Sequence, residues 1–175
     1  MGAATTLSVD VPLVETDRLI LRAPRLEDLE PMVAFYATER SRWVGGPCNR
    51  YESWLRLSSA VGHWLLRGHG MWTIEEKATG AVAGRAGVIH HADWPEPELG
   101  WHLYEGFEGR GIGHEAALAA RNAARDIFGL GPLVSLIVPE NRRSRALAER
   151  LGATVEREGA VLGHPCLVYR HPRSA

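Results

Sequence analysis

The sequence has few cysteines, no long apolar run and almost no net charge. Its 175 residues include two cysteines, Cys48 and Cys166, which are too few for a disulfide framework, so we expect free thiols in a reducing compartment, the cytoplasm. No apolar stretch approaches the roughly 20 residues that span a bilayer, and residues 1–12 lack the basic and apolar regions of a secretory signal. The formal net charge of −1 argues against a nucleic-acid or anionic membrane partner, both of which require a basic excess.

The composition is that of one globular domain. Apolar residues make up 45% and charged residues 23% of the chain, and we expect a single domain over residues 1–175 with residues 1–12 as a loose tail. Hydrophobic periodicity predicts the order strand, two helices, three strands, helix, strand, helix, two strands. That order indicates an α/β (α+β) domain with a mixed sheet and helices on both faces. The predicted strands cover residues 16–22, 71–75, 81–89, 98–103, 133–138, 154–158 and 166–170.

The N-terminal half predicts two helices separated by a loop at residues 39–48. Asp28 is a candidate N-cap for the first helix, and Asn49 with Glu52 forms a capping box for the second. Glycines 84 and 87, within a later predicted strand, indicate close approach of a neighbouring backbone. The second helix carries an apolar stripe that we assign to the core, namely Trp54, Leu57, Val61, Trp64 and Leu65.

The most informative stretch runs from Glu98 to Leu130. A predicted strand is followed by a loop with glycine at alternate positions and then by a helix. A helix N-terminus presents unpaired N–H groups and the positive end of the helix dipole, and the glycines leave those donors open to an anion. The loop therefore predicts a phosphate or pyrophosphate socket formed by Gly109, Arg110, Gly111, Ile112, Gly113 and His114.

Two common phosphate-binding motifs fit this loop less well. A P-loop would continue with Lys and Ser or Thr, whereas His114 and Glu115 follow Gly113, so the P-loop is excluded. A dinucleotide fingerprint would read G-x-G-x-x-G directly after the strand. Here the spacing is G-x-G-x-G, and residues 104–108 intervene. The dinucleotide site remains an alternative.

One histidine-rich segment lies in a predicted polar loop at residues 90–97. It places His90, His91 and Asp93 close together in the sequence. A metal site would need further ligands from a second cluster, and no such cluster is evident. We therefore predict a solvated loop and no metal site.

The glycine-rich loop and the segments around it resemble the GNAT acyltransferase superfamily. Residues 108–113, Glu-Gly-Arg-Gly-Ile-Gly, are similar to its signature Q/R-x-x-G-x-G/A, with Glu108 as a departure that we expect to face solvent. Glu115 and Ala116 resemble the form common in the RimJ/RimL-like branch, as do residues 16–22. A second signature, N-x-x-S/A-x-x-L-Y-x-x-x-G-F, is matched at Asn141, Ser144, Leu147 and Gly152, with Ala148 where tyrosine is usual.

This resemblance implies the GNAT fold, with a mostly antiparallel central sheet of about seven strands that is splayed at its centre. It also implies acetyl-CoA as the acyl donor and coenzyme A as the product. The amides of residues 109–114 would bind the pyrophosphate, with Asn141 and Ser144 contributing from the second signature. The backbone of Trp101 and Leu103 would pair with the pantetheine arm. The resemblance also allows a homodimer.

The chemistry implied by the resemblance is direct attack of a primary amine on the thioester in a ternary complex. It needs a base, an oxyanion donor near Leu103 and a proton for the thiolate. Because Ala148 replaces the usual tyrosine, Ser144 is the candidate proton donor, unless it is simply a first-turn helix serine. Glu98 and His102 share one face of a strand and are candidate bases, with His102 favoured by the intrinsic pKa of histidine. Further candidates are His164 and Glu140.

The acceptor amine is left open by the sequence. The RimJ/RimL-like features favour a protein N-terminal α-amine, as in ribosomal proteins, and a small amine such as an amino acid, polyamine or aminoglycoside is the alternative. A cationic acceptor would need an acidic site, and Trp43 is the candidate aromatic residue for lining the acceptor groove. A non-catalytic acyl-CoA-binding module is an alternative of another class, suggested by Ala148. The acidic residues available for a cationic acceptor are Asp93, Glu96, Glu98 and Glu105.

Overall fold

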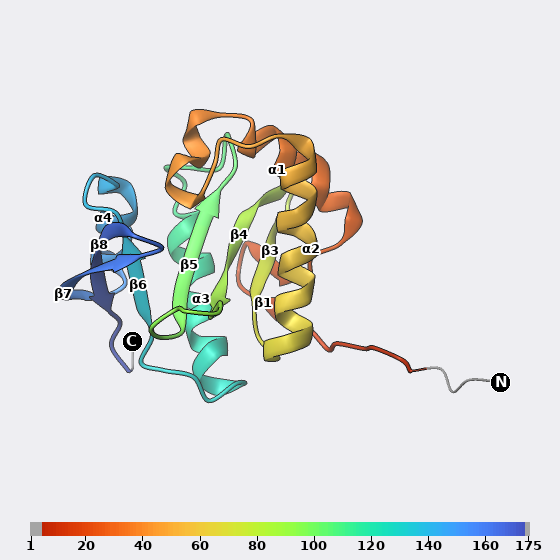
Figure 1. The fold of residues 1–175 in the computed structure, drawn as a ribbon. Coiled ribbons are helices and arrows are strands. Elements are labelled where there is room, and N and C mark those ends of the chain that lie inside the picture. Colours follow the sequence, from red (N-terminus) through yellow and green to blue (C-terminus); the bar gives the residue numbers. More distant parts are fainter. Residues whose placement is uncertain (1–4, 174–175) are drawn as a thin grey trace.

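The computed structural model describes residues 5–173, and its centre is one sheet of eight strands in the order β1-β2-β3-β4-β5-β6-β8-β7 (Figure 1). Neighbouring strands are antiparallel except for β5 and β6, which are parallel. The strands are β1 (Val14–Glu15), β2 (Leu19–Arg22), β3 (Met71–Glu76), β4 (Val82–Ile89), β5 (Glu98–Leu103), β6 (Val134–Ile137), β7 (Thr154–Val161) and β8 (His164–Arg170).

Helices cover both faces of the sheet. α1 (Leu29–Tyr36) and α2 (Arg50–Arg67) lie on one face, and α3 (Ile112–Asp126) and α4 (Arg142–Arg150) lie on the other (Figure 1). The predicted α/β domain with a mixed, mostly antiparallel sheet and helices on both faces is confirmed. The sheet has one strand more than predicted, because Val14 and Glu15 pair with β2 as a short edge strand.

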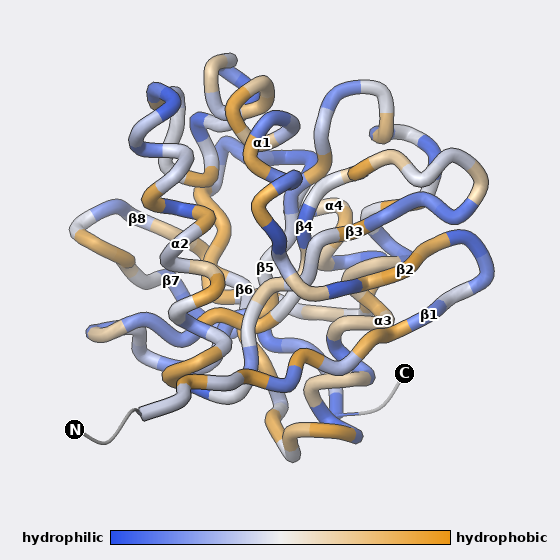
Figure 2. Tube along the Cα trace, turned by 90° about the vertical axis from the view of Figure 1, so that its right-hand side faces the viewer, coloured by the Kyte–Doolittle hydropathy of each residue, from blue (hydrophilic) through white to orange (hydrophobic). Residues whose placement is uncertain are grey.

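The core lies between α3 and the sheet and continues to the end of α2. Leu19 and Leu21 of β2 and Leu99 of β5 are fully buried with the alanines of α3. These small side chains let α3 lie close to the strands. Hydrophobic stretches, orange in Figure 2, run along β2, while the turn between β1 and β2 is hydrophilic. None of the helices described within residues 5–173 is long and apolar enough to cross a membrane.

Residues 9–12 are part of this core rather than a loose tail. Val9 and Val11 pack against it, and the carbonyl oxygen of Pro12 accepts a hydrogen bond from Trp72 Nε1 at 2.8 Å. The predicted tail is therefore wrong for these residues, because apolar side chains spaced two apart find a hydrophobic surface to cover. Residues 1–4 of that tail lie outside the described part of the chain.

Two local predictions are confirmed by backbone geometry. Asn49 Oδ1 accepts from the Glu52 amide at 3.0 Å, and Glu52 Oε2 accepts from the Asn49 amide at 2.8 Å, which completes the capping box of α2. Gly84 and Gly87 do lie against neighbouring backbone. A Cβ atom at Gly84 would lie 2.2 Å from the carbonyl oxygen of His102, so only glycine fits there.

The stripe predicted on α2 is only half right. Leu57 and Trp64 are buried, but Trp54, Val61 and Leu65 are 44%, 42% and 37% exposed. At about 100° per residue, these three exposed positions lie on one side of the stripe. The inward-facing side is completed by the small residues Ser53 and Ala60, which a search for large apolar residues overlooks.

The predicted loop at residues 39–48 begins with a 3-10 helix, η2 (Glu39–Val44), and a second one, η1 (Leu26–Asp28), precedes α1. Asp28 makes no side-chain hydrogen bond that caps α1. Its buried carboxylate instead accepts from Arg22 at 2.8 and 3.0 Å and from Thr73 Oγ1 at 2.7 Å. Burial alone would raise the pKa of Asp28, but these hydrogen bonds lower it. The carboxylate also accepts from the Arg25 amide at 3.0 Å, so the residue joins β2 and β3 to the start of η1 rather than capping α1.

This buried ion pair generates a stability prediction. Replacing Asp28 by asparagine, Asp28→Asn, should lower the free energy of unfolding by about 3 kcal/mol, because it leaves the buried Arg22 guanidinium without its bidentate partner. Urea denaturation at neutral pH measures the loss. The control is Glu30→Gln, which removes a carboxylate that is 67% exposed and paired with Arg50, and should leave stability unchanged. Equal losses in the two variants would contradict this role for Asp28.

Candidate active site

The parallel strands β5 and β6 share one paired position and then diverge. Within the described residues, Glu98 and Val134 form the one pair that joins the two strands, and no later residues of β5 and β6 pair. All four residues of β6 pair instead with β8 on its other side. A V-shaped opening therefore lies between β5 and β6, with its closed end at Glu98.

Side chains take the place of backbone bonds at the closed end of this opening. Ser135 Oγ donates to the carbonyl oxygen of Leu99 at 2.6 Å, and Glu98 Oε1 accepts from the Leu136 amide at 3.1 Å. His171 Nε2 lies 2.9 Å from Ser135 Oγ, and since that hydroxyl proton is already used, the imidazole is the donor. These bonds hold the strands together at the point where their backbone pairing stops.

The open part of β5 presents unpaired backbone groups. Because the Tyr104 amide donates to Ala83 of β4, the even-numbered residues of β5 direct their backbone toward β4, and the odd-numbered residues direct theirs toward β6. The carbonyl of Leu99 fits this pattern, since it accepts from Ser135 of β6. The N–H and C=O groups of Trp101 and Leu103 therefore point into the opening, where the described residues provide no strand partner.

The glycine-rich loop lies at the start of α3, as predicted. Gly109 and Gly111 have φ angles of +71° and +79°, a conformation that favours glycine, and Gly111 is the N-cap residue. No hydrogen-bond acceptor among residues 5–173 lies within reach of the backbone amides from Gly109 to His114. A set of free amides at a helix N-terminus fits a pyrophosphate. Their assignment to a bound cofactor stays a prediction.

Glu115 fixes the position of this helix start. Its carboxylate accepts from Thr16 Oγ1 at 2.5 Å, from Arg18 Nε at 2.7 Å and from the Arg18 amide at 3.1 Å. The guanidinium of Arg18 also donates to the carbonyl oxygen of Arg110 at 2.8 Å. Thr16 and Arg18, to which the sequence pattern gave no role, thus join the loop and α3 to the turn between β1 and β2.

Charged side chains around the loop pair with one another. The Arg110 side chain extends away from the amides to Glu76 of β3. Glu108 is 36% exposed, as expected, but it also forms an ion pair with Arg40 of η2 and lies 3.6 Å from Arg143 of α4. The carboxylate that departs from the family signature therefore binds arginines from the two elements that flank the loop.

Glu98 occupies the closed end of the opening and is 9% exposed. Burial raises its pKa to about 7, although hydrogen bonds from Trp94 Nε1 at 2.6 Å and from the Leu136 amide lower it. A carboxylate with this pKa is half ionised near neutral pH, which suits a general base. Its catalytic role stays a prediction.

His102 lies in a different environment from Glu98. Four residues of strand separate the two by about 13 Å, so the structure does not bring them together. The imidazole of His102 stacks on Phe35 of α1, and burial, together with the charges of Arg85 and Arg56, lowers its pKa to about 3. The sequence favoured His102 as the base because of the intrinsic pKa of histidine. Burial reverses this preference, because an imidazole with a pKa of about 3 holds a proton poorly at neutral pH.

Asn141 and Ser144 lie at the N-terminus of α4. Asn141 Oδ1 accepts from the Ser144 amide at 3.2 Å and caps the helix. Ser144 is half-buried, and its hydroxyl has no partner among the described residues. Ala148 is fully buried against Tyr169 of β8, so the small residue leaves room for that ring. The hydroxyl of Tyr169 binds Arg145 and Glu149 of α4.

The remaining candidates have weaker structural connections to the opening. Trp43 lies in η2, half-buried, with the guanidinium of Arg42 4.5 Å from its ring centroid. His164 and Glu140 are exposed. Among the acidic residues proposed for a cationic acceptor, Glu96 pairs with Arg170 and Arg157, so its charge is already balanced. Within the described residues, no group of three acidic, histidine or cysteine side chains could hold a metal.

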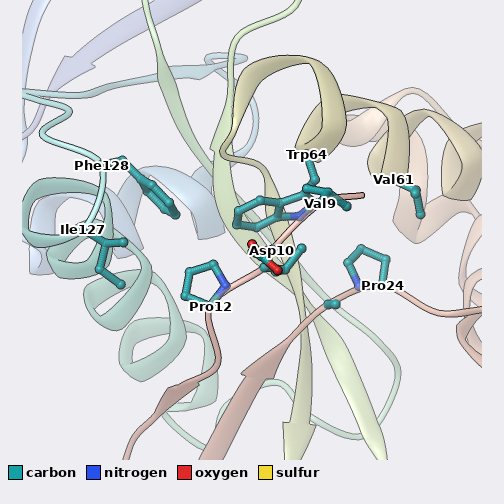
Figure 3. Close-up of a pocket in the computed structure, with 10 residues that line it drawn as sticks. Val9, Asp10, Pro12, Pro24, Val61, Trp64, Ile127 and Phe128 are labelled. Atoms are coloured by element: carbon teal, nitrogen blue, oxygen red, sulfur yellow. The ribbon is translucent and has the colours of Figure 1, made fainter. Parts of the chain in front are cut away.

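A groove of about 620 Å³ lies away from this opening. Figure 3 shows its lining, which comes from the N-terminal segment, the residues after β2, α2 and the residues after α3. Apolar side chains dominate it, and Asp10 is its one ionisable group. The groove therefore offers no chemistry comparable to the opening beside β5. Its lining residues are Val9, Asp10, Val11, Pro12, Ala23, Pro24, Val61, Trp64, Ile127 and Phe128.

Comparison with known proteins agrees with this geometry. The family model of the acetyltransferase (GNAT) domain matches residues 18–154. An acetyltransferase from Agrobacterium tumefaciens str. C58 is 38% identical, with a TM-score of 0.87, over 97% of this chain and 99% of that one. A GnaT-family acetyltransferase from Bordetella pertussis is 25% identical, with a TM-score of 0.79, over 93% and 100% of the two chains.

A more distant structure shows the same fold. RimL, a ribosomal L7/L12 alpha-N-protein acetyltransferase solved in complex with coenzyme A, has a TM-score of 0.74 at 19% identity, over 94% of this chain and 100% of that one. The matched family domain includes the glycine-rich loop, the diverging strands and α4. The chain therefore belongs to the GNAT acetyltransferase family and is an acetyl-CoA-dependent N-acetyltransferase.

Proposed function

We propose that this enzyme transfers an acetyl group from acetyl-CoA to the α-amine at a protein N-terminus, by direct attack in a ternary complex. The proposed acetyl transfer is supported by one observation, the open edge of β5 beside a row of free amides at the start of α3. The fold shared with RimL supports an N-terminal acceptor of the ribosomal-protein type. A small amine is the alternative acceptor.

The chain's own groups fit the acyl donor at two places. The amides of residues 109–114 provide donors for a pyrophosphate, and the positive end of the α3 dipole favours its charge. The backbone groups of Trp101 and Leu103 provide a strand edge with which the amides of a pantetheine arm can pair. Acetyl-CoA supplies the acyl group as an activated thioester. An arm that follows β5 from the loop extends toward Glu98 at the closed end of the opening.

Glu98 is the base in this proposal and Ser144 the proton donor. Glu98 has a pKa matched to neutral pH and lies at the end of β5 toward which the arm extends. It would take the proton of the attacking amine through a water relay, since five residues of strand, about 16 Å, separate it from Leu103. Ser144 has a free hydroxyl at the N-terminus of α4 and would protonate the departing thiolate. A backbone N–H near Leu103 would stabilise the oxyanion.

Thiol release from acetyl-CoA tests the function directly. The acceptor panel contains peptides with free N-termini, the same peptides with blocked N-termini, amino acids, a polyamine and an aminoglycoside. We expect release with the free N-termini and none with the blocked ones. Release with the polyamine or aminoglycoside alone would overturn the N-terminal acceptor, and coenzyme A binding without release by any amine would indicate a non-catalytic binding module.

Substitution of the N-cap glycine tests the anion site. Gly111→Glu places a carboxylate among the free amides, so we expect acetyl-CoA binding to be lost in isothermal titration calorimetry. The control is Gly163→Glu, which introduces the same side chain at a similar φ of +80° in the turn between β7 and β8. It should bind normally. Normal binding by Gly111→Glu would place the pyrophosphate elsewhere, and preference for NAD would revive the dinucleotide alternative.

The pH dependence of turnover tests Glu98. Only the ionised carboxylate accepts a proton. The value of kcat/KM should therefore rise with pH through about pH 7 and level off once Glu98 is fully ionised. Glu98→Gln should lower kcat by about 100-fold or more and remove this inflection. Glu105→Gln, an exposed residue just after β5, is the control. An unchanged pH profile in Glu98→Gln would assign the base to another group.

A third variant, Ser144→Ala, tests the proton donor. The backbone amide that Asn141 caps is kept in this variant, so α4 should remain folded. We expect kcat to fall by about tenfold or more while the KM for acetyl-CoA changes little. Ser59→Ala, an exposed position on α2, serves as the control. Unchanged kinetics for Ser144→Ala would remove the residue from the mechanism.

A further inference from the structure

The face of β4 and β5 that α1 covers holds a compact group of aromatic and basic side chains. His102 lies opposite Arg85 of β4 in the sheet, so the two side chains share this face. The rings of Phe35 and His102 stack with their centroids 5.0 Å apart and an interplanar angle of 10°. The ring of Tyr104 lies 5.9 Å from that of His102 and 5.3 Å from that of Phe35, measured between centroids.

Arg85 is buried in this group without a partner. It is 6% exposed, and its buried Nε atom has no hydrogen-bond partner among residues 5–173. Thr73 lies opposite Arg85 in the sheet, and its hydroxyl binds the carboxylate of Asp28. That carboxylate also accepts two hydrogen bonds from Arg22, so it is already engaged by other residues. The positive charge of Arg85 is therefore not neutralised by a carboxylate of the described chain.

Two neighbouring groups also lack partners. The hydroxyl of Tyr104 and the Nε2 atom of His102 are buried with no hydrogen-bond partner among the described residues. Arg56 of α2 differs, because its terminal nitrogens donate to the carbonyl oxygens of Val44 and Gly45 at the end of η2. The site thus holds a guanidinium, a phenol and an imidazole that have no hydrogen-bond partners among the described residues.

These free groups match one chemical type of ligand. A buried guanidinium without an anion is unfavourable, and a carboxylate can accept two parallel hydrogen bonds from it. Tyr104 and neutral His102 can each donate one more. The planar guanidinium of Arg85 matches a planar carboxylate, which can accept both of its parallel N–H donors.

We propose that Arg85, together with Tyr104 and His102, binds a carboxylate carried by the acceptor amine. This inference rests on the proposed acetyl transfer and narrows its substrate class. His102 and Tyr104 alternate along the chain with Trp101 and Leu103, whose backbone lines the opening. An amine joined to the bound carboxylate by a few bonds is thereby held close to the acyl group. The carboxylate belongs either to a free amino acid or to the acidic first residue of a peptide.

Matched acceptor pairs test this proposal with the wild-type enzyme alone. One arm compares amino acids with their α-carboxamides, and the other compares peptides that begin with Asp or Glu with the same peptides beginning with Asn or Gln. The measurement is kcat/KM from thiol release at saturating acetyl-CoA. We expect at least a tenfold preference for the carboxylate in one arm, which also identifies its source. Turnover without a preference in either arm would overturn the inference and leave the acetyltransferase function standing.

Variants of Arg85 then assign the preference to this residue. Arg85→Met should reduce the preference to within twofold by slowing the carboxylate acceptors, and Arg85→Lys should keep part of it. Unchanged binding of coenzyme A confirms that these variants fold. The control is Arg67→Met, an exposed arginine at the end of α2. A folded Arg85→Met that kept the full preference would overturn the assignment. If none of the amines tested gave thiol release, the proposed function would be overturned, and this inference with it.

Discussion

The divergence of β5 from β6 is the constraint on which the rest of the structure depends. A strand edge that pairs with nothing is unfavourable inside a protein, since buried N–H and C=O groups need partners. The chain satisfies this requirement at the closed end with the side chains of Glu98, Ser135 and His171. Further along, Trp101 and Leu103 keep their backbone groups free. These backbone groups are therefore left for hydrogen bonds with a peptide-like ligand.

The N-terminal segment holds this arrangement in place. Thr16 and Arg18 bind Glu115 at the start of α3, while Arg22 binds the buried Asp28 and also Glu75 of β3. The glycine-rich loop is flexible by composition, but here it is fixed at one end by an ion pair with a turn almost a hundred residues away in the chain. The free amides are thus positioned before any ligand binds, which reduces the entropy that ordering would cost.

Charge is distributed unevenly around the opening. Glu96 and Glu108 are paired with arginines, and Glu98 is half ionised at neutral pH because it is buried. On the face beneath α1, the arginines exceed the carboxylates, and Arg85 keeps its charge unpaired among the residues that the structure describes. In the proposed function, this pattern disfavours polyamines and aminoglycosides, and the proposed carboxylate site connects the choice of acceptor to Arg85 of β4.

The sequence alone determined the features that depend on local backbone geometry. The alternate glycines predicted the free amides at α3, Asn49 and Glu52 predicted the cap of α2, and Gly84 predicted close backbone contact, since each follows from φ angles or from neighbours within a few residues. Burial could not be predicted in this way. The tertiary structure decided that Glu98 and not His102 has a pKa near neutrality. It also decided that Trp54 is exposed and that Arg85 lacks a partner within residues 5–173. Each of these depends on side chains brought together from distant strands and helices.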